Sequence, residues 1–328
     1  MSIRRLLPIP LLLLAFPAAA HAQTVTTPVT EPAEPAPAAG KASFRIAGGL
    51  ATKKTRYFAP SQQVVVRGVV KPYVRGEVLT LYAIRRGKAS KKVRRAVGRR
   101  GRYEFRFKVG NPGPVRLVVK HRGTAAQKAF RTRDETIQVV DWEAGVGSRG
   151  LKVLLLQRGL LKLGFATPVT GVYDGLTSNG VLAFRKTNGL GRSGYAMKSV
   201  FAMVMRGDGA YKLRYPRSGE NGKHVEFDWS RQVLVLARRG RPYRVYHTSS
   251  GAPVTPTVFG SYRFYRQDYG TNAKGMVHSS YFIGGYAIHG YASVPNYPAS
   301  HGCLRVPIPS AWSIFNWIDI GDPIHTYR

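Results

Sequence analysis

The sequence predicts a multidomain, mainly β protein in which a small three-helix domain separates an N-terminal β-sandwich from a C-terminal β domain. Three observations support this fold class. The chain of 328 residues is longer than one hydrophobic core usually organises. Short runs of β-type residues recur over residues 41–140 and again over residues 222–328. Between them, over residues 141–210, leucines recur at steps of three and four residues, which is the period of an amphipathic helix.

The first 40 residues predict an export signal followed by a linker. The basic pair Arg4-Arg5 precedes an apolar run over residues 6–16, and a small-x-small cleavage pattern follows at residues 20–22. We therefore expect residues 1–22 to be a cleaved signal peptide. An uncleaved anchor is the alternative, but the apolar run is about half of the roughly 20 residues that span a bilayer. Residues 23–40 are rich in Pro, Ala and Thr, which is typical of an extended linker.

Residues 41–140 are expected to form a basic β-sandwich. The runs QQVVVRGVV, EVLTLYAI, YEFRFKV and VRLVVKH are separated by turn-rich gaps. This segment holds 26 Lys and Arg against 4 Asp and Glu, most densely in KASKKVRRAVGRRGR. These charges are either solvated hairpin ends or a surface that binds an anionic wall polymer.

The formal net charge of the whole chain is +35, which predicts attraction to polyanions. Nucleic acid is one class of polyanion that such a charge attracts, but an export signal argues against it. We expect no nucleic-acid partner and no permanent membrane span, because no later stretch is long and apolar enough for one. The expected location is secreted, in the cell wall or on the periplasmic side of the cell envelope.

Residues 141–210 carry the helical pattern. The strings GSRGLKVLLLQRGLLKLGF and TGVYDGLTSNGVLAFRKTNGL, within Gly147–Leu190, resemble the peptidoglycan-binding domain, a three-helix module. Thr177 is expected to cap the orphan amides of a helix start, which puts Val181 and Phe184 on one face of that helix. The resemblance implies that this domain docks on peptidoglycan. A helical spacer that binds nothing is the alternative.

Residues 222–328 are expected to form a mainly β domain with one helix near its end. The runs HVEFDW, QVLVLA and YRVYHTSS have the composition of strands. Ser310 is expected to cap a helix over AWSIFNWID that ends at Gly321, with Trp312 and Phe315 facing inward.

The chemistry concentrates around the only cysteine of the chain, Cys303. It cannot form an intramolecular disulfide, and a thiol attacks only as thiolate, so it needs a neighbouring imidazole or cation. If residues 301–305 run extended, His301, Cys303 and Arg305 project to one face because side chains alternate along a strand. Arg305 can then bind a substrate carboxylate, and the backbone amides at Gly302 and Cys303 can hold an oxyanion.

The block GYAIHGYASVPNYPASHGCLRV, residues 285–306, resembles the catalytic motif of L,D-transpeptidases. Upstream, TSSG at residues 248–251 and TPTVFGSYRF at residues 255–264 resemble earlier strands of that family. The resemblance implies that Cys303 is the nucleophile and that His289 is the general base that activates it.

The same resemblance implies further roles around the thiol. The backbone carbonyl of Gly290 would orient His289, His301 would support the substrate and oxyanion, and Arg305 would bind the donor peptide. Ser300 is expected to shape the turn or to bond locally, without attacking anything.

The implied reaction is a two-step acyl transfer on peptidoglycan. Cys303 would attack the carbonyl of the third stem residue and expel D-alanine, and an amine of a neighbouring stem would then resolve the thioester into a 3-to-3 cross-link. The implied partners are peptidoglycan stem peptides and glycan, and the resemblance also implies acylation of Cys303 by carbapenems. No metal or organic cofactor is expected, because a covalent intermediate already divides the exchange into two steps.

Two other functions stay open at this point: an L,D-carboxypeptidase that uses water as acceptor, and a non-catalytic wall-binding protein with a decayed site. A zinc site drawn from His278, His289, His301 and Cys303 is disfavoured, because their spacing lacks a close ligand pair of known type.

Overall fold

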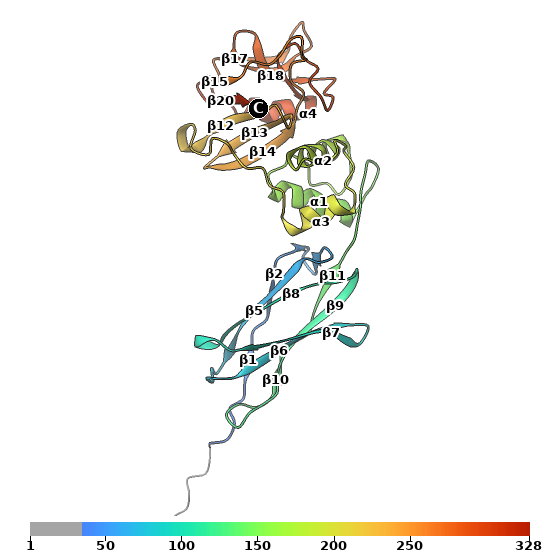
Figure 1. Ribbon diagram of the computed structural model, residues 1–328, viewed down its shortest axis with the longest axis vertical. Helices are drawn as coiled ribbons and strands as arrows, with labels where there is room; N and C mark the ends of the chain where they lie inside the picture. Colours follow the sequence, from blue (N-terminus) through green and yellow to red (C-terminus); the bar gives the residue numbers. More distant parts are fainter. Residues whose placement is uncertain (1–34) are drawn as a thin grey trace, which may run out of the picture. The chain divides into compact units, whose positions relative to one another are not determined.

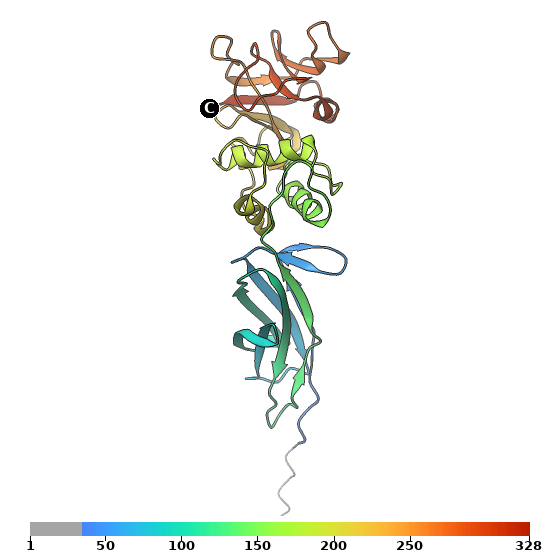
Figure 2. The same cartoon turned by 90° about the vertical axis from the view of Figure 1, so that its right-hand side faces the viewer.

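A computed structural model describes residues 35–328 of the chain (Figures 1 and 2). The predicted signal peptide and the linker as far as residue 34 lie outside the described residues. Within the described part, no helix combines the length and the apolar character that crossing a bilayer requires.

Two sheets form the segment between residues 41 and 139. In the first, β5 is the central strand and pairs with β1, β2 and β8; in the second, the order is β3-β4-β11-β9-β6-β7, with β10 on β9. Side chains of both sheets, such as Val64 and Phe105 from one and Leu81 and Leu117 from the other, share one hydrophobic core. The elements are β1 (Lys41–Ala42), β2 (Arg45–Ala47), β3 (Leu50–Ala51), β4 (Arg56–Phe58), β5 (Gln63–Lys71), β6 (Val78–Arg85), β7 (Lys88–Ala96), the 3₁₀ turn η1 (Arg99–Gly101), β8 (Arg102–Lys108), β9 (Gly113–His121), β10 (Phe130–Arg131) and β11 (Glu135–Val139).

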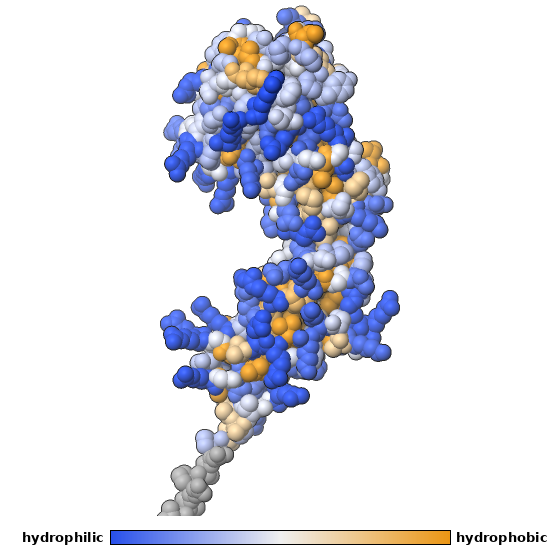
Figure 3. Space-filling view, in the orientation of Figure 1, coloured by the Kyte–Doolittle hydropathy of each residue, from blue (hydrophilic) through white to orange (hydrophobic). Residues whose placement is uncertain are grey.

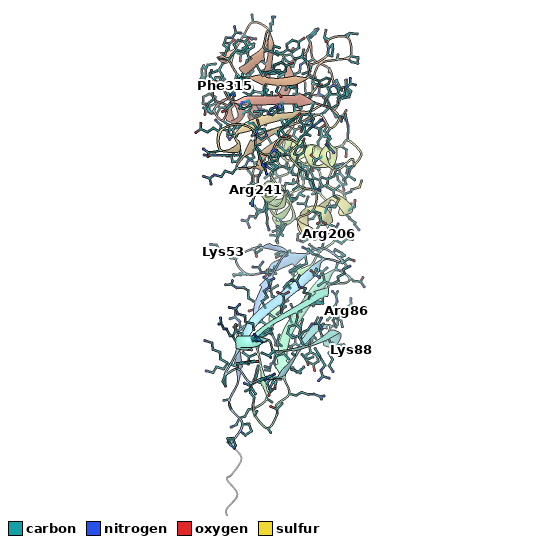
Figure 4. The ribbon with its side chains drawn as sticks, turned by 60° about the vertical axis from the view of Figure 1, so that its left-hand side comes forward. Lys53, Arg86, Lys88, Arg206, Arg241 and Phe315 are labelled. Carbon is teal, nitrogen blue, oxygen red and sulfur yellow. The ribbon has the colours of Figure 1, made fainter. Side chains whose placement is uncertain are left out.

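The densest basic run of the sequence lies on the edge strand β7 of the second sheet. Every side chain of β7 is exposed except the half-buried Val93. Arg86 and Lys88, at the β6–β7 turn, project away from the sheet (Figure 4), and hydrophilic side chains project from this part of the chain in Figure 3. An exposed row of Lys and Arg on an edge strand discourages pairing with another strand.

Three helices follow, namely α1 (Leu151–Lys162), α2 (Gly175–Thr187) and α3 (Lys198–Arg206). The helix start predicted at Thr177 is wrong by three residues. Asp174 is the N-cap residue of α2, and its Oδ1 accepts the Thr177 N–H at 2.8 Å. A carboxylate at this position also suits the positive end of the helix dipole. Val181 and Phe184 are fully buried, as their spacing predicted.

The C-terminal segment contains two more sheets. A five-stranded sheet has the order β14-β13-β12-β20-β15, and a four-stranded sheet has the order β16-β17-β18-β19. Its elements are the 3₁₀ turn η2 (Glu220–Gly222), β12 (His224–Asp228), β13 (Val233–Arg238), β14 (Arg241–His247), β15 (Gly260–Arg263), β16 (Arg266–Thr271), β17 (Val277–Ile283), β18 (Tyr286–Tyr291), β19 (Leu304–Pro307), α4 (Ile308–Phe315) and β20 (Pro323–Tyr327).

Strand β13 is buried on both faces, which explains the continuous apolar run VLVLA in its sequence. Leu234 and Leu236 face the core of the C-terminal segment. Val233 and Val235 face the opposite way and join the core that the helices build. The helical segment therefore packs directly on the outer face of the five-stranded sheet, as the position of α2 beside β14 in Figure 1 illustrates.

The helix predicted near the C-terminus is present, but its boundaries and faces differ from the prediction. Helix α4 begins at Ile308 after the N-cap residue Pro307, so Ser310 lies inside the first turn and is not the cap. Pro309, in the first turn, replaces an amide that has no partner within the helix. Trp312 is 49% exposed, and the inward face is made by Ala311 and Ile314.

Candidate active site

Two parallel strands bring the predicted site residues to one face of the four-stranded sheet. β18 and β19 pair in register, with His289 beside Arg305 and Ile288 beside Leu304. Ile288 and Leu304 point into the core of the C-terminal segment. Because side chains alternate along a strand, His289 and Arg305 point to the opposite face. Cys303, two residues before Arg305, packs on this same face against a small cluster that includes Ala287.

The extended conformation expected for residues 301–305 holds only from Leu304 onward, because residues 301–303 form a bend. The bend depends on Gly302, which has φ of +110° and is buried. A Cβ atom at Gly302 would lie 2.1 Å from the ring of Tyr286, so neither the conformation nor the space admits a larger residue. The bend delivers Cys303 to the start of β19.

Ser300 stabilises this bend through its hydroxyl group. Ser300 Oγ accepts the Gly302 N–H at 3.1 Å and donates to the Cys303 carbonyl at 2.5 Å. The Gly302 amide is thereby engaged inside the turn, so it is not the oxyanion donor that the sequence indicated. For the Cys303 amide, no hydrogen bond occurs within the described residues.

The segment TSSG and the following Thr257 hold the loop that carries Cys303. Thr248 Oγ1 donates to the Arg305 carbonyl at 2.6 Å, and Ser249 exchanges backbone hydrogen bonds with Arg305. Thr257 Oγ1 donates to the Gly302 carbonyl at 2.7 Å. These contacts fix the backbone on both sides of Cys303.

His289 is buried, and its tautomer follows from one hydrogen bond. Its Nδ1 lies 2.9 Å from the carbonyl oxygen of Gly290, and since a carbonyl only accepts, Nδ1 carries the proton. Nε2 is then the basic nitrogen. Burial lowers the pKa of His289, and the charge of Arg305 lowers it further, against the opposing effect of the Gly290 hydrogen bond. The imidazole is therefore neutral at neutral pH.

Cys303 is a thiol in this arrangement. Its Sγ donates to the Gly285 carbonyl at 3.6 Å, and between Cys303 and His289, both within the described residues, no hydrogen bond forms. Burial raises the pKa of the Cys303 thiol, which the backbone of Ala287 and the charge of Arg305 counteract only in part. The resting site is thus a neutral thiol and a neutral imidazole on one face, not an ion pair.

Arg305 supplies a fixed positive charge next to the thiol. Its guanidinium lies 4.2 Å from the centroid of the Tyr291 ring. The Tyr291 ring in turn meets His289 edge-on, with centroids 5.6 Å apart. Arg305 forms no ion pair with any carboxylate of residues 35–328, so its donors are available to a ligand.

The other two histidines of the predicted set lie apart from this face. His301 is exposed in the bend, and it forms no hydrogen bond with the described residues. His278 lies among Tyr269, Trp312 and Phe315, and its Nδ1 accepts the Gly270 N–H. Over the described range, no three His, Cys, Asp or Glu side chains gather as metal ligands do.

Sequence reasoning missed Lys186, which reaches the site from helix α2. Its Nζ is buried and donates to the Gln232 carbonyl at 3.1 Å, to His247 Nδ1 at 2.8 Å and to the Thr248 carbonyl at 3.2 Å. His247 Nε2 then donates to Val294 O at 2.9 Å, in the loop between the two site strands. No pattern in the sequence pointed to this contact, because its partners lie 46 or more residues away.

Comparison with known proteins identifies the family of the C-terminal domain. Residues 222–325 match the family model of the L,D-transpeptidase catalytic domain (YkuD). The crystal structure of an L,D-transpeptidase (residues 123–326) from Xylanimonas cellulosilytica is 32% identical, with a TM-score of 0.52, over 57% of this chain and 98% of that one. The chain belongs to the L,D-transpeptidase family. The match to that structure extends over more of the chain than the catalytic domain alone.

Other solved L,D-transpeptidases are more distant. An L,D-transpeptidase (Yku) from Stackebrandtia nassauensis is 18% identical, with a TM-score of 0.36, over 56% of this chain and 95% of that one. The catalytic domain of the E. faecium L,D-transpeptidase acylated by ertapenem is 22% identical, with a TM-score of 0.28, over 32% of this chain and 96% of that one. A search of curated proteins found no significant match.

Proposed function

We propose that this L,D-transpeptidase is an exported enzyme that forms 3-to-3 peptidoglycan cross-links through a Cys303 thioester, with release of D-alanine. One observation carries the proposal. A thiol, an imidazole with a free basic nitrogen and a guanidinium without a carboxylate partner share one face of the β18–β19 pair. These are the nucleophile, the base and the anion-binding group that acyl transfer to a thiol needs.

In the first step, Cys303 Sγ attacks the carbonyl carbon of the third stem residue. Because thiol and imidazole both rest neutral, the thiol proton passes to His289 Nε2 as the carbon–sulfur bond forms. The bond to the terminal D-alanine nitrogen then breaks, and the proton on His289 goes to that leaving amine. Arg305 binds a carboxylate of the donor peptide through its fork of donors.

In the second step, an amine of a neighbouring stem attacks the thioester. His289 takes a proton from that amine as the amide bond forms, and passes it to the sulfur as the carbon–sulfur bond breaks, which returns Cys303 to its thiol and His289 to its neutral state. The unengaged amide of Cys303 is the donor that we assign to the oxyanion in both steps. His301, exposed two residues before Cys303, is assigned to support the bound substrate.

Further parts of the proposal concern the rest of the chain. We assign residues 1–22 to a signal peptide, residues 23–40 to a linker, residues 41–140 to a basic β-sandwich and residues 141–210 to a peptidoglycan-binding domain. The exposed basic strand β7 supports contact with an anionic wall polymer of the cell envelope. Carbapenems, which are acyl donors like the stem peptide, are expected to acylate Cys303.

Incubation of the full chain with a disaccharide-tetrapeptide, read by mass spectrometry, tests the function. We expect a cross-linked dimer and free D-alanine from the native protein, and neither from the Cys303→Ala protein. Tripeptide without dimer would show an L,D-carboxypeptidase, and no change with the native protein would refute an enzyme. Ser293→Ala is the matched control. Ser293 lies in the loop between β18 and β19, and its replacement keeps the thiol, so this protein should still make dimer.

The base is tested separately by the rate at which a carbapenem acylates Cys303. We expect the His289→Ala protein to acylate at least about a hundredfold more slowly, since a positioned general base typically contributes that much. An unchanged acylation rate would show that another group takes the thiol proton.

A further inference from the structure

A groove lies between the helical segment and the catalytic domain. One part has a volume of about 350 Å³ and is walled by residues of α2 on one side and by β14 and α4 on the other. An adjoining part of about 360 Å³ shares Asn179, Pro307 and Pro309 with the first and continues to Tyr291. Each part is in the size range of small-molecule sites.

The two walls of the groove are held rigidly together. Residues 164–166 run alongside β14, where Ala166 N–H donates to the Val245 carbonyl at 3.0 Å and Val245 N–H donates to the Gly164 carbonyl at 2.8 Å. Gly180 of α2 permits this contact, because a Cβ atom there would lie 2.7 Å from the Ala166 carbonyl oxygen. The buried Nζ of Lys186 joins the same two walls. A groove between fixed walls loses little conformational entropy when it binds a ligand.

The groove leads to the reacting groups. Tyr291 lines its second part, and the same ring carries the guanidinium of Arg305 and meets His289 edge-on. Pro307, which lines both parts, lies four residues after Cys303. At about 3.3 Å per residue, this places the groove about 13 Å from the nucleophile.

The chemistry of the lining selects the kind of ligand. Tyr243 and Trp317 are stacked at an angle of 13°, with centroids 6.1 Å apart, and Tyr243 is 43% exposed. The Asn179 amide and the Ser310 hydroxyl line the groove without a hydrogen bond from their side chains to the described residues. No carboxylate lines either part. Among the described residues, the one cation in the lining is Arg244, whose guanidinium lies 4.5 Å from the centroid of the Tyr243 ring. An aromatic wall with a guanidinium donor, beside free amide and hydroxyl groups, suits a hydroxylated and N-acetylated ring, whose hydroxyl and carbonyl oxygens accept hydrogen bonds.

We propose that this groove binds the N-acetylated sugar that carries the donor stem peptide. The assignment rests on the proposed function, because the peptide attacked by Cys303 is attached to that sugar through its other end. The first three residues of the stem, when extended, span roughly 10 Å, which is close to the separation of Cys303 and the groove. The helical segment thereby contributes one wall of the substrate site.

The test compares two donors, the disaccharide-tetrapeptide and the free tetrapeptide, with the full-length enzyme. We expect kcat/KM to be at least about tenfold higher for the donor that carries the sugar, the gain typical of aromatic contact plus hydrogen bonds. In Tyr243→Ala and in Asn179→Trp, which fills the groove, the ratio should fall close to 1. Tyr243→Phe, which keeps the ring, and Tyr269→Ala, which removes an exposed tyrosine outside the groove, should keep the ratio of the native enzyme.

Two results would overturn the proposal but leave the proposed reaction standing. One is a kcat/KM ratio of the two donors close to 1 in the native enzyme, and the other is a ratio that stays at the native value in both Tyr243→Ala and Asn179→Trp. A second readout does not depend on catalysis. The peptide-free disaccharide should bind the Cys303→Ala protein and perturb the NMR signals of residues 176–179 and 307–313. Perturbation confined to other residues, or no binding at all, would also overturn the assignment, whereas failure of the native enzyme with both donors would refute the reaction itself.

Discussion

Replacing Lys186 by methionine removes a buried cation that joins the helical segment to the catalytic domain. Lys186 is 4% exposed, and its three hydrogen-bond partners are two carbonyl oxygens and a histidine nitrogen, with no carboxylate among them. Burial therefore lowers the pKa of Lys186 to about 7, and the charge of Arg192 acts in the same direction. The unfolded chain keeps the ordinary pKa of 10.5.

The size of the effect follows from these two pKa values. Between pH 7 and pH 10 the unfolded chain holds a proton that the folded protein has released, so the free energy of unfolding rises with pH by about 1.4 kcal/mol per pH unit. Over this interval, Lys186 adds about 3–4 kcal/mol to the stability of the native protein. Lys186→Met does not show this rise in stability with pH. Between pH 7 and pH 10, the free energy of unfolding of the native protein should therefore increase by about 3–4 kcal/mol relative to that of the variant.

At pH 7 the two proteins should differ less. The substitution leaves His247 Nδ1 and the Thr248 carbonyl without a donor, which costs about 1–3 kcal/mol each, while the Gln232 carbonyl keeps the Thr248 N–H. The substitution also removes the cost of burying a charge, which is about 4 kcal/mol at pH 7 from the two pKa values. These contributions have opposite signs and similar sizes.

Urea unfolding followed by tryptophan fluorescence at pH 7, 8, 9 and 10 measures the difference. Lys162→Met, which replaces an exposed lysine of α1, should track the native protein at every pH and is the matched control. A gap between the native protein and Lys186→Met that stays constant from pH 7 to pH 10 would refute the lowered pKa and the contact behind it.

Three further outcomes test the catalytic face. Gly302→Ala should lower the free energy of unfolding by about 2–5 kcal/mol, because alanine would be strained at this φ and would displace Tyr286. Urea unfolding measures the loss, and a loss below about 1 kcal/mol would contradict the bend. Arg305→Lys keeps the charge but loses the planar contact with Tyr291, so kcat/KM should fall about 10- to 100-fold, and an unchanged value in steady-state kinetics would exclude its role in donor binding. Burial raises the pKa of Cys303 above its usual 9.0, so thiolate absorbance, taken as the difference from Cys303→Ser, should appear only above pH 9; a thiolate at pH 7 would show a resting ion pair.

Much of the fold was accessible from the sequence because its signals are local. Runs of β-type residues such as QQVVVRGVV predicted strands, and Val181 and Phe184 predicted the buried face of α2. The ends of the helices were harder to predict from the sequence. The cap of α2 is Asp174 and not Thr177, because both side chains can accept an amide and the choice depends on the preceding backbone.

The candidate site divides in the same way. The motif predicted the residues of the site, whereas the parallel pairing of β18 with β19 placed His289 and Arg305 on one face. The Gly302 amide is no longer assigned to the oxyanion, because the Ser300 hydroxyl engages it. His301 does not continue the alternation of Cys303 and Arg305, because the strand begins only at Leu304.

By itself, the sequence determined the short-range features of this protein: the strands, the helices and the motif residues around Cys303. Only the tertiary structure decided which distant surfaces meet. Val233 and Val235 meet the helices, Lys186 reaches His247 across 61 residues, and two modules together enclose a groove beside Tyr291. The physical reason is that the periodicity of a strand or helix records that a face is buried, but an apolar face carries no mark of the partner that will cover it.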